Sequence, residues 1–203
     1  MSKIKNEKTK STFIVLVVMF MSLQIQSQKV LIETTAGNIE IVLDSKKAPI
    51  ATSNFMQYVK DKVYDGASFY RAVRLDNQRS DQPHIEVIQG GINNDTLKRR
   101  GQIELERTTL TGLKHIDGTI SMARSTPNSA SSEFFICIND QPSLDFGGNR
   151  NPDGQGFAAF GKVVKGMDVV KKIQNEKTTF YSSLGLNQLI VDPVKIIKIR
   201  KIK

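Results

Sequence analysis

Several polar clusters in the 203-residue chain contain residue types that could do chemistry, but at spacings that fit no known site. His115, Asp117 and Ser121 are the residue types of a hydrolytic triad, yet nothing around Ser121 resembles a nucleophile elbow. The glycine-rich stretch 147–156 lacks the G-x-x-x-x-G-K-[ST] spacing of a phosphate-binding loop. We therefore interpret the triad types as a chance association, His115 as structural, and the glycine-rich stretch as a surface loop.

Residues that could bind a metal ion are equally sparse. Asp145, Asn151 and Asp153 offer oxygen ligands for calcium, but their spacing matches no EF-hand loop. The single cysteine, Cys137, and the two histidines are too few for a zinc site of cysteine and histidine ligands. Because Cys137 lies in an apolar run, we expect it to be a small buried side chain, and we expect no metal ion.

Five short motifs elsewhere in the chain are more specific, and they follow one another in a fixed order. They are FYR at 69–71, IQGG at 88–91, GTISMAR at 118–124, SEFFI at 132–136 and FGKVVKGM at 160–167. Together they resemble the cyclophilin family of peptidyl-prolyl isomerases, and the resemblance extends over residues 30–202. It implies a closed eight-stranded antiparallel β-barrel capped by two helices, a substrate groove on the outer face of the barrel, and no cofactor.

The resemblance implies that Arg71, Gln89 and Phe135 are the catalytic residues. An X-Pro bond isomerises slowly because amide resonance imposes a barrier of about 18–20 kcal/mol. A fixed cation that donates a hydrogen bond to the proline nitrogen stabilises only the twisted bond, in which that nitrogen gains a lone pair. Arg71 is the implied cation, Gln89 orients it and contacts the substrate, and Phe135 forms the floor of the proline pocket.

The resemblance assigns seven further residues to substrate binding: Val87, Ala123, Arg124, Ser125, Glu133, Leu144 and Phe157. Val87 and Leu144 form the walls of the implied pocket, and Phe157 forms its rim. The backbone of residues 123–125 binds the substrate chain beside the proline. Glu133 stands where the family usually has glutamine.

The chain departs from the family pattern at several positions. Glu133 could pair with Arg71 and partly neutralise it, and Glu86 replaces a phenylalanine, which would thin one pocket wall. Two insertions, about 75–84 and 147–155, are expected to form surface loops. The two glutamates favour an alternative function, a binding module or chaperone that holds proline-containing segments with little turnover. Because the three catalytic residues are retained, we expect an active isomerase.

The elements that must position these residues are short strands with turn signals between them. Apolar positions alternate on both sides of the turn at 35–38, which indicates two paired strands. Helices are expected to begin at Pro49 and to cover 166–173. Residues 191–202 mix isoleucine with lysine and arginine, as in an exposed closing strand whose charges protect a sheet edge. The pattern predicts one mainly-β domain over residues 28–203.

Residues 1–27 have the composition of a secretory signal peptide. Four lysines precede an uncharged apolar run at 13–23, and a small residue, Ser27, follows. The run is shorter than the roughly 20 residues that span a bilayer. We expect cleavage near Ser27, export to the periplasm or the medium, and no stable membrane insertion afterwards. A buried N-terminal helix and an uncleaved anchor are the alternatives.

Composition and charge are those of an ordinary globular protein, with 39% hydrophobic and 24% charged residues and a net charge of +9. Loss of residues 1–27 would remove four lysines and one glutamate and leave +6. This charge permits a nucleic-acid or other anionic partner, a third hypothesis. The basic residues are scattered, however, and the basic C-terminal segment contains no aromatic side chain. We expect proline-containing polypeptides as partners, no nucleic acid, and a monomer.

Overall fold

The computed structural model describes residues 28–93, 97–181 and 185–203. The predicted signal peptide and its cleavage near Ser27 therefore lie outside the described residues. Within those ranges, no helix combines the length and the apolar character needed to cross a membrane.

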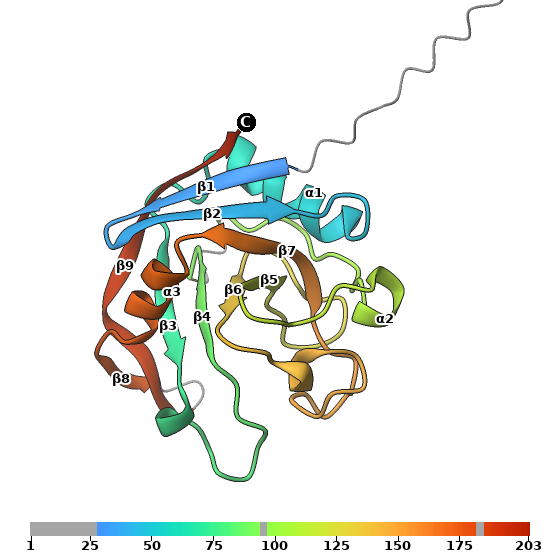
Figure 1. Cartoon of the computed structure of the whole chain (residues 1–203), viewed down its shortest axis with the longest axis vertical. Coiled ribbons are helices and arrows are strands. Elements are labelled where there is room, and N and C mark those ends of the chain that lie inside the picture. Colours follow the sequence, from blue (N-terminus) through green and yellow to red (C-terminus); the bar gives the residue numbers. More distant parts are fainter. Residues whose placement is uncertain (1–27, 94–96, 182–184) are drawn as a thin grey trace, which may run out of the picture.

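Eight antiparallel strands close into a barrel, as predicted (Figure 1). Their neighbour order is β1-β2-β7-β5-β6-β4-β3-β9, and β9 pairs back onto β1. The strands are β1 (Gln28–Thr34), β2 (Gly37–Leu43), β3 (Ser68–Val73), β4 (Val87–Gly91), β5 (Thr119–Met122), β6 (Phe134–Cys137), β7 (Ala158–Lys165) and β9 (Leu186–Ile202).

Both predicted helices are present, as α1 (Pro49–Lys60) and α3 (Met167–Gln174). Four short elements were not predicted. They are α2 (Thr108–Thr111), strand β8 (Thr178–Tyr181), which pairs with the first part of β9, and two 3-10 turns, η1 (Leu75–Asn77) and η2 (Pro142–Leu144).

The C-terminal strand β9 closes the barrel, but it is not a sheet edge. Its backbone pairs with β3 through Phe69 and Val194 and with β1 through Lys29 and Ile202. The expectation that its charges protect an exposed edge is therefore wrong. They lie on the outer face instead, where Arg200 donates a 2.7 Å hydrogen bond to Glu33.

Alternating strand residues fill the barrel with apolar side chains. On β1 and β2, residues such as Ile32 and Ile41 are fully buried. Residues that alternate with them, such as Glu33 and Glu40, are only partly buried. Pro49 occupies the first turn of α1, where its missing N–H costs nothing, and α1 carries Phe55 into the core. Phe55 packs edge-on against Phe134 of β6, with ring centroids 5.4 Å apart.

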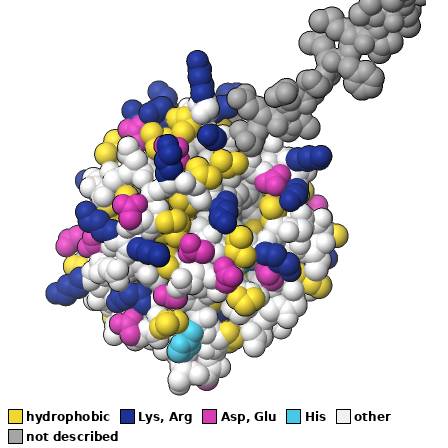
Figure 2. All heavy atoms as spheres, viewed as in Figure 1, with side chains coloured by type: hydrophobic (Ala, Val, Ile, Leu, Met, Phe, Trp, Pro, Cys, Tyr) yellow, Lys and Arg dark blue, Asp and Glu magenta, His cyan; other side chains and the backbone are white. Residues whose placement is uncertain are grey.

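The outer surface carries its charges in a dispersed pattern. On the face in Figure 2, lysine and arginine side chains are interspersed with acidic and uncharged ones and form no continuous basic patch. This is the distribution expected of a solvated surface, since phosphate backbones favour clustered cations.

Candidate active site

One cavity of about 420 Å³ on the outside of the barrel is lined by all ten residues predicted for catalysis and substrate binding. The sequence interpretation did not include its other lining residues, which are Tyr70, Ile85, Arg99, Ser129, Ser131, Ser132, Arg150 and Asn151. The ten residues come from β3, β4, β6 and the loops around β5 and β7, so closure of the barrel brings them together.

The apolar half of the cavity is built on strand alternation. Because successive side chains of β6 point to opposite faces, Phe134 enters the barrel core and Phe135 enters the cavity. Phe135 meets Phe157 at nearly a right angle, with ring centroids 5.4 Å apart. Val87 and Leu144 belong to the same small cluster, together with Val73, Ile85 and Cys137, and this cluster is separate from the barrel core. The cluster can bind a small apolar ring and exclude water from it.

His115 supports the apolar half from the side, since its ring stacks against Phe135 at 5.9 Å. Its Nδ1 lies 2.8 Å from Asp145 Oδ1, and its Nε2 lies 3.0 Å from Ser121 Oγ. The association of His115 with Ser121 is therefore not accidental, although the acidic partner is Asp145 rather than Asp117. Ser121 is fully buried and beyond the reach of a substrate, so the group is structural.

Burial lowers the pKa of His115, which favours a neutral ring. The hydrogen bonds fit one tautomer, in which Nδ1–H donates to Asp145 and Nε2 accepts from the Ser121 hydroxyl. The hydrogen bond from His115 holds the pKa of Asp145 below its usual range despite the opposing effect of burial. A neutral imidazole beside an ionised carboxylate thus underlies the pocket floor.

The polar half of the cavity is a relay of hydrogen bonds that starts at Arg71. The Nη1 group of Arg71 donates to Gln89 Oε1 at 2.7 Å. Gln89 Nε2 donates to the Tyr70 hydroxyl at 2.7 Å, and that hydroxyl donates to Glu133 Oε2 at 2.6 Å. The predicted orientation of Arg71 by Gln89 therefore has a geometric basis. The two side chains meet because Arg71 of β3 and Gln89 of β4 lie directly opposite each other in the sheet.

Glu133 does not take the expected place against Arg71. Its two oxygens accept hydrogen bonds from Tyr70 and Ser132, and Gln89 stands between the carboxylate and the guanidinium. Burial raises the pKa of Glu133, and these hydrogen bonds only partly oppose the rise.

The carboxylate of Glu133 also lies close against the backbone of β4 at Gly91. A Cβ atom at Gly91 would lie 2.6 Å from Glu133 Oε2, and Gly91 has a φ of 147°. Glycine is therefore required at this position both for its backbone conformation and for the close approach of the acid.

Glu86 is not one of the residues that line the cavity, so its side chain adds nothing to the pocket wall. Side chains alternate at the start of β4, so Ile85 and Val87 line the cavity. Glu86 instead accepts a 2.7 Å hydrogen bond from Asn139 Nδ2. Of the two glutamates that favoured a binding module, only Glu133 lines the cavity.

The loop at 147–155 is more than a surface loop, because Arg150 and Asn151 line the cavity. Asp153 accepts two 2.8 Å hydrogen bonds from Arg124, which lower the pKa of Asp153 to about 2. The Arg124 guanidinium also lies 5.1 Å from the centroid of the Phe157 ring. Arg124 therefore fixes the loop to the pocket rim.

The three oxygen ligands considered for calcium do not converge. Asp145 contacts His115 and Lys114, whereas Asp153 contacts Arg124. In the parts of the chain that the structure describes, no three histidine, cysteine or acidic side chains gather where they could hold a metal ion. Cys137 is fully buried in the apolar cluster, as predicted.

A second glutamine contacts the arginine and was missed. Gln188 of β9 accepts hydrogen bonds at its Oε1 from Arg71 Nε at 3.0 Å and Nη2 at 2.7 Å. No local pattern indicates this contact, because the two residues lie 117 positions apart. The guanidinium is thus held beside an apolar pocket, where it can act on a developing lone pair.

Comparisons with known proteins agree with this geometry. Residues 29–201 match the family described as cyclophilin type peptidyl-prolyl cis-trans isomerase/CLD. The chain is 38% identical to peptidyl-prolyl cis-trans isomerase A of Dickeya dadantii over 176 residues, which cover 85% of this chain and 86% of that protein. It is also 38% identical to a peptidyl-prolyl cis-trans isomerase of Acinetobacter baylyi, with 83% and 82% covered.

The fold is likewise shared with a solved structure. A crystal structure of a Cryptosporidium parvum cyclophilin-type isomerase, obtained in the presence of the dipeptide Ala-Pro, superposes with a TM-score of 0.68 at 21% identity, covering 87% of this chain and 99% of that one. The family match and the two bacterial relatives show the same family. The chain belongs to the cyclophilin-type peptidyl-prolyl cis-trans isomerases, the enzymes that rotate X-Pro peptide bonds.

Proposed function

We propose that this isomerase acts on X-Pro bonds of exported, incompletely folded polypeptides, with Arg71 as the group that stabilises the twisted bond. The observation that carries the proposal is the position of a guanidinium held by Gln89 and Gln188 beside the apolar cluster around Phe135. A cation next to an apolar ring site matches a substrate whose ring is uncharged and whose nitrogen becomes electron-rich.

The apolar half receives the proline ring. Phe135 and Phe157 form a corner that can hold the ring, and Val87 and Leu144 close its sides. This anchors one side of the peptide bond while the other side rotates. The structure of the Cryptosporidium relative in the presence of the dipeptide Ala-Pro supports a proline-containing ligand.

Arg71 acts only as the bond twists. In the planar amide the nitrogen lone pair is delocalised and accepts hydrogen bonds poorly, whereas in the twisted amide it is localised. A charged hydrogen bond is worth about 1.5–3 kcal/mol. At about 1.4 kcal/mol per factor of ten, this corresponds to a ten- to hundredfold acceleration. No proton leaves the site and no covalent intermediate forms.

The substrate chain beside the proline is proposed to bind along residues 123–125. Ala123 and Ser125 line the cavity next to Arg124, whose side chain is committed to Asp153. The backbone N–H groups of Ala123 and Ser125 already donate to the Glu133 carbonyl and to Ser129 Oγ. The carbonyl oxygens of this stretch can still accept from an extended peptide of any sequence, because backbone hydrogen bonds do not read side chains.

A coupled proteolysis assay on a Xaa-Pro peptide tests the chemistry. We expect wild type to be fast and Arg71→Ala to be ten- to hundredfold slower in kcat/KM. Arg79→Ala is the matched control, since Arg79 is an exposed arginine outside the cavity. A folded wild type that binds the peptide without accelerating exchange would instead support the binding module.

Export is a separate part of the proposal, supported by the lysines and the apolar run of residues 1–27. Expression of the full chain in a bacterium, followed by fractionation and N-terminal sequencing, tests it. We expect a periplasmic product that begins near residue 28. An uncut chain in the membrane fraction would support the anchor, and an uncut chain in the cytoplasm would contradict export.

A further inference from the structure

We infer that Gln188 is a positioning residue for the reaction: it holds the Arg71 guanidinium in the orientation that meets the twisted bond. This inference rests on the role proposed for Arg71. Gln188 does not line the substrate cavity, so it acts through the arginine and not on the substrate.

Two glutamines hold the arginine from different sides. Gln188 Oε1 accepts from the edge formed by Nε and Nη2, at 3.0 and 2.7 Å. Gln89 Oε1 accepts from Nη1 at 2.7 Å. A guanidinium is planar, so contacts at two of its sides fix both its plane and its rotation within that plane. Loss of Gln188 would remove the acceptor at the edge formed by Nε and Nη2 and would weaken the hold on both the plane and the rotation of the guanidinium.

Gln188 is itself fixed in one amide orientation. It is fully buried on β9, and its Nε2 donates a 2.9 Å hydrogen bond to the backbone carbonyl of Asn77. Reversal of the amide would turn its NH2 group toward the donors of Arg71 and its oxygen toward that carbonyl. Both contacts would then be repulsive. The amide is therefore an oriented acceptor for the arginine.

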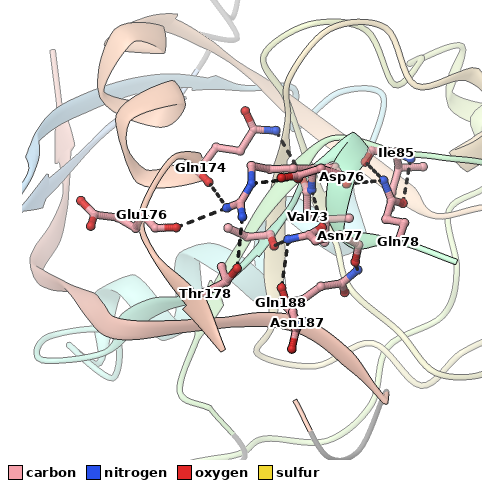
Figure 3. Close-up of polar contacts among 12 residues, drawn as sticks. Val73, Asp76, Asn77, Gln78, Ile85, Gln174, Glu176, Thr178, Asn187 and Gln188 are labelled. Carbon is pink, nitrogen blue, oxygen red and sulfur yellow. Dashed lines mark hydrogen bonds and ion pairs between the residues drawn. The ribbon is translucent and has the colours of Figure 1, made fainter. Parts of the chain in front are cut away.

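The carbonyl that holds this amide belongs to a corner of the molecule with many hydrogen bonds (Figure 3). The side chain of Asn77 accepts from the backbone N–H of Arg74 at 2.8 Å and donates to the Asn187 carbonyl at 3.1 Å. Asn77 thus ties the turn η1 to the residue that directly precedes Gln188. The insertion at 75–84, expected to be a surface loop, supplies this support.

Arg74 extends the support to helix α3. In Figure 3, Gln174, Glu176 and Thr178 surround one guanidinium, which their hydrogen bonds identify as that of Arg74. Nη1 donates to the carbonyls of Gln174 and Glu176 at 2.9 and 3.2 Å, and Nη2 donates to Thr178 Oγ1 at 3.1 Å. The chain of contacts therefore runs from the end of α3 through Arg74, Asn77 and the buried amide to the catalytic arginine.

An arginine that is fixed before the substrate arrives should affect kcat more than KM. A donor that is already aimed does not have to be reorganised as the bond twists, so the gain appears in the transition state. Ground-state binding depends on the apolar cluster around Phe135 and on residues 123–125. Loss of Gln188 should therefore lower kcat and leave KM nearly unchanged.

The experiment compares two buried glutamines of the same corner in the full chain. Gln188→Met removes the acceptor of Arg71. Gln174→Met removes a buried amide that donates to the Val73 carbonyl, and it keeps the backbone carbonyl of residue 174 that accepts from Arg74. We expect both variants to lose thermal stability. Only Gln188→Met should lose about tenfold in kcat, with KM changed less than about twofold. Should Gln188→Met fail to fold, Gln188→Asn keeps the amide but withdraws its oxygen, and the same kcat loss is expected.

A double variant separates positioning from general damage. If Gln188 acts only through Arg71, Gln188→Met should have no further effect in an Arg71→Ala background. The Arg71 Nε–H signal in a ¹H–¹⁵N NMR spectrum should also broaden in Gln188→Met and persist in Gln174→Met.

Equal kcat losses in the two methionine variants, or additive effects with Arg71→Ala, would overturn the inference. A wild type without isomerase activity would instead overturn the proposed function itself. An active wild type that Arg71→Ala slows and Gln188→Met does not would overturn only the role of Gln188.

Discussion

Two neighbouring phenylalanines on β6 serve different regions of the molecule. Phe134 is fully buried in the barrel, where it meets Phe55, Tyr64 and Phe69 edge-on. Phe135 faces the opposite way and meets Phe157 and the His115 ring. The interior cluster is closed, while the outer one borders an open cavity. The same residue type thus contributes to stability on one face of the strand and to a ligand site on the other.

The largest expected effect tests this contrast directly. Phe134→Ala should lower the free energy of unfolding by about 3–5 kcal/mol, because it leaves a cavity in a closed core. Phe135→Ala should lower it less, since one side of that ring already borders the cavity. Its kcat/KM should nevertheless fall by about ten- to hundredfold, because the proline ring loses its apolar floor.

Two measurements compare Phe134→Ala with Phe135→Ala: chemical denaturation, and activity per folded molecule. Both are made at a temperature where both variants are folded. Folded Phe134→Ala should retain most of its activity. The contrast between the two faces of β6 would fail if the two variants lost stability and activity in the same proportion.

An intermediate effect concerns acid, because the outer cluster rests on a titratable ring whereas the interior one does not. The pKa of His115 is lowered by burial from its ordinary 6.5. The neutral ring therefore contributes stability above about pH 6.5, and this contribution is lost as pH falls through the lowered value. Asp145, whose pKa is also lowered from 3.8, adds a further loss at still lower pH.

Thermal denaturation between about pH 8 and pH 4 measures this effect. The melting temperature of wild type should fall on acidification. The melting temperature of His115→Gln should fall less over the upper part of that pH range. His84→Gln is the matched control, because His84 is exposed and should leave the curve of wild type unchanged. Identical curves for His115→Gln and wild type would contradict the assignment.

The smallest effect concerns the polar half of the cavity. Because the pKa of Glu133 is raised above its ordinary 4.5, its favourable contribution to folding is present at low pH and is lost as pH rises through the raised value. Glu133→Gln should therefore raise the melting temperature at neutral pH and have little effect near pH 4. With the negative charge removed from the relay to Arg71, kcat/KM should rise by about two- to threefold. A fall in kcat/KM would show that the carboxylate assists Arg71.

Sequence alone could predict what depends on local pattern. Alternation predicted the paired strands around residues 35–38, and the family resemblance that the quoted motifs carry implied ten residues that line one cavity. The contact between Arg71 and Gln188 could not be predicted this way, because it depends on which strands become neighbours when the barrel closes. For the same reason, the sequence did not indicate the acidic partner of His115: Asp117 lies close to it in the chain, whereas η2 brings Asp145 to the ring.

The closing strand also sets the order of events when the chain is made. Strand β9 pairs with β1, so residues from opposite ends of the chain must meet before the barrel exists. It also supplies the neighbour of β3, where Arg71 lies opposite Leu189. Contacts so distant in sequence form slowly, because loop-closure entropy opposes them until they are made. A partly synthesised chain therefore lacks both the closed barrel and the second glutamine at its arginine, and the enzyme gains its activity only when its last strand arrives.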